Sequence, residues 1–206
     1  MRKLILDLCG GTGAWSKPYA DAGYTVHNIT LPDYDLMETC LQSLPPQYIN
    51  FKKPFTDSRY PGILQIDIPD IYGILAAPDC AHFSFARQRA KIPRDIPGAF
   101  ELVKECRLII ETCALYGDLK FWCLENPRGH LYEIIGLPAF KFQRWHFGDP
   151  GNKLTYLWGN FKFPKMKPKP ELIDSDFMQS GCWQKIAIPS GYRKKGWDSK
   201  IIKRER

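Results

Sequence analysis

The sequence predicts an α/β protein built on a mostly parallel, Rossmann-like sheet with helices on both faces. Three observations indicate this class. Apolar stretches of strand length alternate with segments of helical spacing, which favours a parallel sheet. A glycine-rich turn at residues 9–13, Cys-Gly-Gly-Thr-Gly, separates the first of these stretches from the first helical segment. Residues 72–77 are continuously apolar, as a strand buried on both faces should be.

The first elements form one strand–turn–helix–strand unit. Residues 3–7 predict a strand, residues 14–22 a helix that Gly23 ends, and residues 24–30 a second strand. Glycines in the intervening turn let the backbone approach a ligand, while the N-terminus of the helix faces that ligand. The unit is therefore typical of nucleotide-binding folds.

The remaining elements follow in the same alternation. Residues 36–44 predict a short helix that two prolines stop, and residues 99–116 predict a long one that Gly117 ends. The later strands are short and apolar, and we expect them at residues 63–68, 72–77, 121–124 and 155–158. No second core-sized block is evident, so we expect a catalytic domain over residues 1–159 and a short basic extension over residues 160–206.

The composition of the 206 residues excludes several classes of protein. Hydrophobic residues make up 44% and charged residues 25%, as in ordinary globular domains. No apolar stretch approaches the roughly 20 residues that span a bilayer, which predicts a cytoplasmic protein without a membrane partner. The seven cysteines include no Cys-x-x-Cys pair, and the four histidines lack ligand spacing, so we expect neither a disulfide framework nor a metal site.

The net charge of +7 is unevenly distributed. Residues 1–150 hold 16 Lys and Arg against 17 Asp and Glu, whereas residues 151–206 hold 13 against 5. A basic last quarter indicates a polyanionic partner, although lysines on a solvated surface would explain it equally well.

Four polar residues are predicted where parallel strands end: Asp7, Asp67, Cys80 and Glu125. Each could be structural by itself, as a turn or cap residue. Ligands of open parallel sheets bind at the carboxyl ends of the strands, so one cleft could hold all four.

At this point a family resemblance emerges. The stretch Asp-Leu-Cys-Gly-Gly-Thr-Gly-Ala-Trp-Ser at residues 7–16 resembles the cofactor loop of the cytosine C5 DNA methyltransferases. Pro-Asp-Cys-Ala-His-Phe-Ser at 78–84 is similar to their nucleophile motif, and Glu-Asn-Pro at 125–127 to their Glu-Asn-Val. Residues 147–153 resemble a fourth motif, and the four occur in the family's order within residues 4–159.

The resemblance implies a Rossmann-like methyltransferase fold, S-adenosyl-L-methionine as cofactor and double-stranded DNA as substrate. Cys80 would add to carbon 6 of a flipped cytosine while Glu125 meets ring nitrogen 3. The implied catalytic residues are Cys80, Glu125, Asn126 and Lys153. The implied cofactor-binding residues are Asp7, Cys9, Gly11, Gly13, Trp15, Thr30, Asp67 and Pro78. The implied DNA-binding residues are Ser84, Arg87, Arg89, Arg94, Lys153, Arg193, Lys194 and Lys195.

The chain also departs from the family pattern. Asp79 replaces a proline, and its charge would raise the pKa of the neighbouring thiol unless the side chain turns away. Lys153 stands where an arginine is expected, and Thr30 where the family has an acid for the ribose; Asp33 or Asp35 could substitute for that acid. About 47 residues follow Gly159, too few for a separate target-recognition domain. Relaxed or short sequence specificity would result, as in small phage-like enzymes.

The sequence leaves alternatives open. The same chemistry could act on RNA or a free nucleotide, or deliver a group larger than methyl from a modified cofactor. A catalytically silent relative that binds nucleic acid or a partner subunit is a third reading. We expect a monomer, with a separate specificity partner as one possibility, in a bacterial or phage-infected cell.

Overall fold

The computed structural model describes residues 3–42, 45–53, 62–87, 90–147 and 153–167. These residues form strands, three α-helices and three short 3-10 helices. In chain order the elements are β1 Leu4–Leu8, α1 Lys17–Asp21, β2 Thr25–Ile29, β3 Asp35–Gln42, β4 Tyr48–Lys52, β5 Ile63–Asp67, η1 Ile68–Asp70, β6 Ile71–Ala76, η2 Phe85–Arg87, α2 Ile96–Tyr116, β7 Phe121–Pro127, α3 Leu131–Ile135, β8 Phe140–Gln143, η3 Arg144–Phe147 and β9 Leu154–Asn160.

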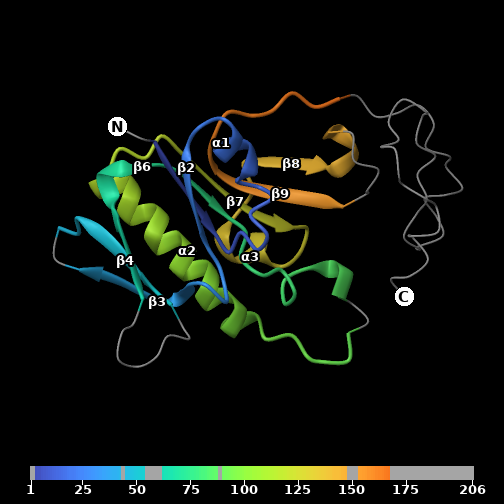
Figure 1. Cartoon of the computed structure of the whole chain (residues 1–206). Coiled ribbons are helices and arrows are strands. Elements are labelled where there is room, and N and C mark those ends of the chain that lie inside the picture. The colour runs from blue at the N-terminus through green and yellow to red at the C-terminus, as the bar shows by residue number, and fades with distance from the viewer. Residues whose placement is uncertain (1–2, 43–44, 54–61, 88–89, 148–152, 168–206) are drawn as a thin grey trace, which may run out of the picture. The chain divides into compact units, whose positions relative to one another are not determined.

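The main sheet has six strands in the order β2-β1-β6-β7-β9-β8, which confirms the predicted α/β class with a mostly parallel sheet (Figure 1). Strand β1 pairs in parallel with β2 and with β6, and β6 pairs in parallel with β7. The chain runs from β1 to β2 on one side and returns through β6 on the other side of β1. The carboxyl ends of β1 and β6 therefore flank a topological switch point, where open α/β sheets form ligand crevices.

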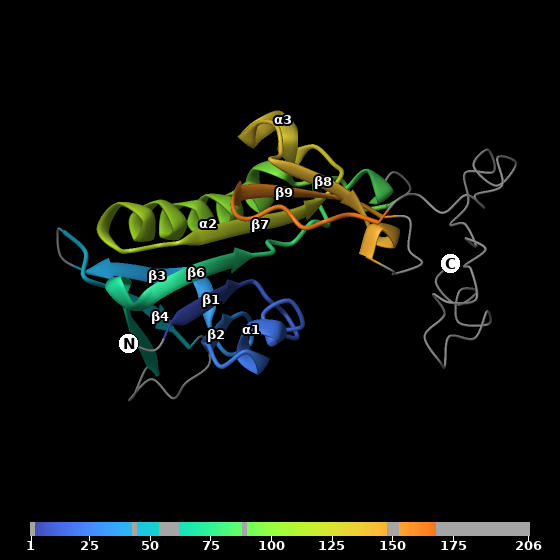
Figure 2. The same ribbon diagram turned by 90° about the horizontal axis from the view of Figure 1, so that it is seen from above.

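Apolar packing on both faces holds this sheet in place. On one face Ile5, Leu75 and Cys123 form a buried cluster that Trp15 and Tyr19 cover. On the other face lies α2, whose buried residues are Val103, Cys106, Ile109, Ile110, Thr112 and Cys113. Figure 2 shows α1 and α2 on opposite sides of the sheet. Each fully buried aliphatic side chain contributes about 1.5–3 kcal/mol, so these two layers dominate the stability of the sheet.

Capping residues set the length of α2. The Asp95 side chain accepts a hydrogen bond from the Gly98 backbone amide at 2.9 Å, and Pro97 lies in the first turn. The backbone amide of Gly117 donates to the carbonyl of Cys113 at the other end. These signals place the helix slightly earlier than the predicted start at residue 99.

Two sequence predictions in the segment between β2 and β6 are wrong. Residues 35–42 form strand β3 and not a helix, because they pair antiparallel with β4. Strand β5 was expected in the parallel sheet, but it pairs antiparallel with β4 in a separate three-stranded sheet of order β3-β4-β5. Ile49 and Phe51 of β4 are fully buried, so long-range packing outweighs the helical propensity of Leu36, Met37 and Glu38.

The residue contacts divide the chain into two compact units. The first consists of Met1–Phe140 with Tyr156–Lys162, and the second of Lys141–Thr155 with Phe163–Arg206. The predicted boundary between residues 159 and 160 stays a prediction, since most of the predicted extension lies outside the described residues. Across the part of the chain that is described, no helix has the length and apolar character needed to span a membrane.

Candidate active site

The turn after β1 has the backbone geometry of a ligand-binding loop. Cys9, Gly11 and Gly13 have φ values of 58°, 55° and 70°, in the left-handed region that favours glycine. The Asn28 side chain of β2 donates a hydrogen bond to the carbonyl of Gly11 at 2.9 Å. A Cβ atom added to Gly11 would meet nothing within 4 Å, so this part of the turn faces open space.

Asp7 supports this turn from beneath. Its side chain is fully buried, and neither carboxyl oxygen has a hydrogen-bond partner of normal geometry among the described residues. Gly10 packs directly against the carboxyl group, which leaves no room for a Cβ atom there. Burial raises the pKa of Asp7, and the nearby Ser16 opposes part of this effect. The predicted cofactor residue thus underlies the loop and is not exposed to a ligand from solvent.

The loop after β6 presents Cys80 in a tight turn. Cys80 is partly exposed and is not part of a disulfide bond. The backbone amides of Phe83 and Ser84 both donate to the carbonyl of Cys80, at 3.0 and 2.9 Å. The Asp79 carboxylate accepts from the amide of Ala81 at 3.0 Å, so this exposed group is engaged in the backbone turn that follows it.

Backbone hydrogen bonds join this loop to the one that follows β7. The amide of His130 donates to the carbonyl of Phe83 at 2.9 Å, and the amide of Phe85 donates to the carbonyl of Arg128 at 3.2 Å. Ser84 and Gly129 form the antiparallel bridge between them. A Cβ atom on Gly129 would collide with the Phe83 carbonyl, so this close approach requires glycine.

A buried side-chain hydrogen bond adds a second connection between the same two loops. The Asn126 amide nitrogen donates to the carbonyl of Pro78 at 3.0 Å, and Asn126 is fully buried. Glu125 precedes Asn126 and is partly exposed, and Cys80 follows Pro78 by two residues. The structure thus brings the segments of the predicted nucleophile and the predicted acid together at one edge of the sheet.

Two further residues fix the Cys80 loop. The Arg94 guanidinium donates to the carbonyls of His82 and Ser84, at 2.8 and 2.9 Å. The backbone amide of Asp95 donates to Nδ1 of His82 at 2.7 Å. Arg94 was predicted to contact DNA phosphates, but its guanidinium contacts the loop backbone. The sequence identifies Arg94 as a positively charged residue of this segment. It gives no sign that Arg94 bonds to backbone carbonyls 10 and 12 residues earlier in the chain.

Asp67 does not join this site. It is the last residue of β5, pairs with Tyr48, and leads through η1 into the amino end of β6. The glycine turn and Cys80 lie at the carboxyl ends of β1 and β6, which is the opposite edge. Asp67 was expected at the carboxyl end of a strand of the parallel sheet, beside the implied cofactor, and that placement of β5 is wrong.

The other predicted cofactor residues have mixed surroundings. Trp15 packs against the buried cluster of the sheet, so most of its role is in the core. Thr30 follows β2, and its carbonyl accepts a hydrogen bond from the amide of Tyr34 at 3.0 Å. The Asp35 carboxylate accepts from the amide of Met37, within its own turn, whereas Asp33 is exposed.

Several predicted nucleic-acid contacts lie beyond what the structure describes. Arg89, Arg193, Lys194 and Lys195 fall outside the described residues, and for Arg87 only the backbone, in η2, is described. Ser84 accepts a hydrogen bond from the amide of Ala86 at 3.2 Å. Lys153 is exposed and belongs to the second unit.

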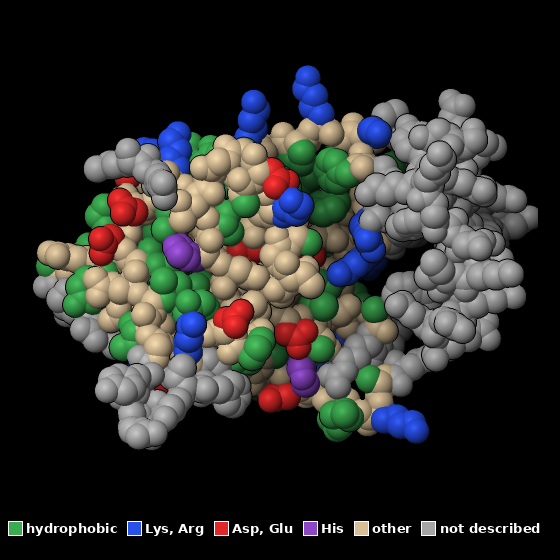
Figure 3. Space-filling view, viewed as in Figure 1, with side chains coloured by type: hydrophobic (Ala, Val, Ile, Leu, Met, Phe, Trp, Pro, Cys, Tyr) green, Lys and Arg blue, Asp and Glu red, His purple; other side chains and the backbone are tan. Residues whose placement is uncertain are grey.

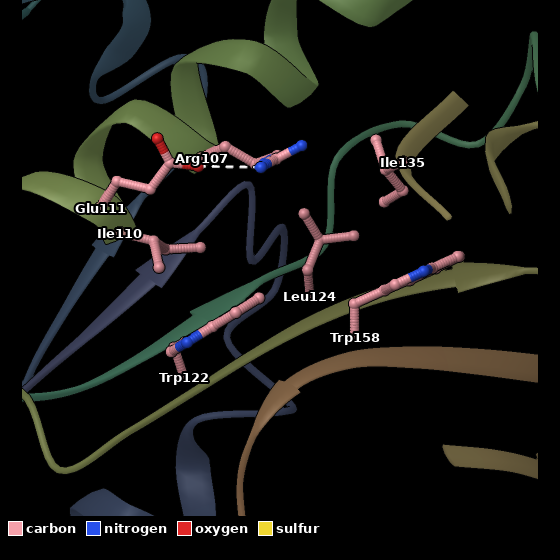
Figure 4. A pocket seen from close by; sticks show the side chains of 7 residues that line it. All are labelled: Arg107, Ile110, Glu111, Trp122, Leu124, Ile135 and Trp158. Carbon is pink, nitrogen blue, oxygen red and sulfur yellow. Dashed lines mark hydrogen bonds and ion pairs between the residues drawn. The ribbon is translucent and has the colours of Figure 1, made fainter. Parts of the chain in front are cut away.

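The first unit also contains a small cavity between α2 and the sheet. It has a volume of about 130 Å³, and Trp122, Leu124 and Trp158 line its sheet side (Figure 4). Arg107 and Glu111 of α2 form an ion pair at its edge, with a distance of 2.9 Å between Nη2 and Oε1. Small-molecule sites usually measure roughly 300–1,000 Å³, so we interpret this cavity as a packing gap.

Comparisons with known proteins add no family assignment. No protein-family model matches the chain, and no curated protein matches it significantly. Within the described residues, no cluster of His, Cys, Asp or Glu could hold a metal ion.

Proposed function

We propose that the protein is an S-adenosylmethionine-dependent methyltransferase with a Rossmann-like methyltransferase fold, which acts on carbon 5 of cytosine in DNA. The observation that carries this proposal is the backbone connection between the loops after β6 and β7, which brings the segments of Cys80 and Glu125 to the sheet edge where the glycine turn lies. A nucleophile, an acid and a cofactor loop at one switch point are what this reaction requires.

The glycine turn fits the proposed cofactor in its backbone geometry. Gly11 and Thr12 are exposed, and because Gly11 has no side chain its main-chain atoms are open to a ligand. Asn28 of β2 stabilises the turn through its hydrogen bond to the Gly11 carbonyl. The residues that would hold the cofactor are Cys9, Gly11, Thr12 and Gly13. When bound, the cofactor would supply an electrophilic methyl group on a sulfonium sulfur.

The proposed reaction uses the Cys80 thiolate as nucleophile. Its sulfur forms a bond to carbon 6 of the cytosine ring, and Glu125 donates a proton to ring nitrogen 3 as electron density moves onto the ring. Carbon 5 would then be nucleophilic and could take the methyl group, which would leave the bound cofactor as a neutral thioether. A base such as a water molecule would remove the proton from carbon 5, Glu125 would take back the proton from ring nitrogen 3, and the bond between sulfur and carbon 6 would break, with Cys80 leaving as thiolate. Asn126 positions the end of β7 throughout through its bond to Pro78.

The decisive experiment follows the label from the cofactor. Protein, DNA and S-adenosylmethionine with a labelled methyl group should produce labelled DNA, and the Cys80→Ser variant should not. Cys182→Ser is the matched control, because it removes a thiol outside the four motifs and should retain activity. DNA that contains 5-fluorocytosine should form a covalent adduct with the wild type.

Other outcomes would replace the proposal. Label on free dCMP or RNA but not on DNA would assign a different substrate. A mass increase of the base other than that of a methyl group would assign a different transferred group. Tight DNA binding with neither label nor adduct would show a catalytically silent protein.

A further inference from the structure

The second unit carries a cluster of aromatic side chains at its surface. Trp145 and His146 are stacked, with ring centroids 3.8 Å apart and an angle of 24° between the ring planes. Phe147 contacts Phe142 edge-on at 5.2 Å and lies 6.4 Å from His146. Phe147 is 43% exposed although it belongs to this cluster. The unit therefore presents an aromatic side chain to solvent on a supporting layer of other rings.

Lysine and arginine residues precede and follow this aromatic cluster in the second unit. The described cations of the second unit are all exposed: Lys141, Arg144, Lys153, Lys165 and Lys167. The backbone amide of Lys167 donates to the carbonyl of His146 at 3.1 Å, which places the lysine-rich segment beside the rings. Among the described residues of this unit there is no Asp or Glu.

This charge pattern differs from that of the first unit. There, exposed lysines and arginines alternate with acids and form ion pairs such as Lys17–Asp21 and Lys104–Glu101. Figure 3 shows this mixture of red and blue side chains over the left and centre of the view. A described surface with cations and rings but without acids is suited to a polyanion that also offers flat apolar faces.

We infer that the second unit binds a single-stranded stretch of nucleic acid, with unpaired bases stacked on Phe147 and the Trp145–His146 pair, and phosphates beside the lysines. Exposed rings stack on any unpaired base, whereas bases within a duplex are already stacked on each other. Backbone charge alone would favour the duplex, whose phosphates are denser, so it is the exposed ring that favours the single strand. In naming the substrate form this inference rests on the proposed function, but its evidence does not involve Cys80, Glu125 or the glycine turn.

Anisotropy of a fluorescein-labelled oligo(dT) measures this binding in the full-length chain, without cofactor. We expect the wild type to bind the single strand more tightly than a duplex of equal length at equal salt. Phe147→Ala should weaken single-strand binding roughly 5- to 150-fold, the usual effect of losing one stacked base. Phe147→Trp should restore it, which separates stacking from a general loss of folding. Leu115→Ala removes a 72% exposed apolar side chain of the first unit and should change nothing.

Salt dependence tests the cations. Lys165→Ala should lower the slope of log affinity against log salt by about 0.7, and the control Lys17→Ala should not. Equal binding by Phe147→Ala and the wild type, or tighter binding of the duplex, would overturn the inference. Since no methyl transfer is measured, single-strand binding without methylation would refute only the proposed function, and methylation with unchanged binding by Phe147→Ala would refute only this inference.

Discussion

Replacing Arg94 should loosen the turn that carries Cys80. Its guanidinium holds two backbone carbonyls, those of His82 and Ser84. Hydrogen bonds to a charged group contribute about 1.5–3 kcal/mol each, and because Arg94 is only partly buried we take about 2–3 kcal/mol for both together. Arg94→Ala should therefore shift the opening equilibrium of the loop by roughly 30- to 150-fold.

Hydrogen exchange of two amides reports this opening directly. The amides of Phe83 and Ser84 donate to the Cys80 carbonyl, so both should exchange faster by that factor in Arg94→Ala. Arg94→Lys keeps the charge but loses the planar fork, so we expect it to protect these amides incompletely. Arg107→Ala is the control, because Arg107 is an arginine of α2 that pairs with Glu111 of the same helix.

The opposite result would identify Arg94 as a phosphate ligand. In that case exchange would stay at the wild-type rate in Arg94→Ala, and the salt slope of duplex binding would fall by about 0.9. Wild-type duplex binding by Arg94→Lys would agree with that outcome, because a phosphate contact depends more on the charge of the side chain than on the planar guanidinium group. Either finding would refute the loop-holding role.

Three other predictions concern the same edge of the sheet. Gly129→Ala should lower the free energy of unfolding in urea by about 1–3 kcal/mol, because the added methyl group would collide with the Phe83 carbonyl. Gly136→Ala is the control, because a Cβ atom there meets nothing within 4 Å and the variant should lose only the free energy of its backbone strain. Equal losses of unfolding free energy in the two variants would contradict the predicted collision. Because burial raises the pKa of Asp7, its contribution to stability is fully present below its unfolded pKa of about 3.8 and is lost as pH rises through the higher folded value. Urea unfolding at several pH values should therefore show this loss in the wild type and not in Asp7→Asn; parallel pH profiles would exclude it. Glu125→Gln should reduce turnover by orders of magnitude with little change in DNA affinity, and undiminished turnover would remove Glu125 from the mechanism.

Local sequence signals were sufficient for the central strands and the glycine turn. Strands β1, β6 and β7 are short, apolar and buried, so their pattern reports their environment. The left-handed positions Gly11 and Gly13 and the end of α2 at Gly117 follow equally from residue type. These features place the candidate site at the edge where it was expected.

Features that depend on long-range pairing were not predictable in the same way. Strand β4 and the pairing of β3 with it have no local signature, and their omission misplaced Asp67. The hydrogen bonds of Arg94 to the Cys80 loop and the close approach of Gly129 to Phe83 depend on segments that meet only in the folded chain. Backbone atoms make these contacts, and residue types carry little information about them.

The connection between the loops after β6 and β7 has a consequence for protein engineering. Its hydrogen bonds at Phe83, Phe85, Arg128 and His130 are made by main-chain groups, whereas Gly129 is restricted by the close Phe83 carbonyl and Phe83 by its full burial. Outward-facing side chains such as that of Arg128 can consequently be randomised in a combinatorial library while the scaffold beneath them keeps its alignment. If the proposed function holds, selection from such a library could alter which nucleotides are tolerated next to the target without rebuilding the proposed pair of Cys80 and Glu125.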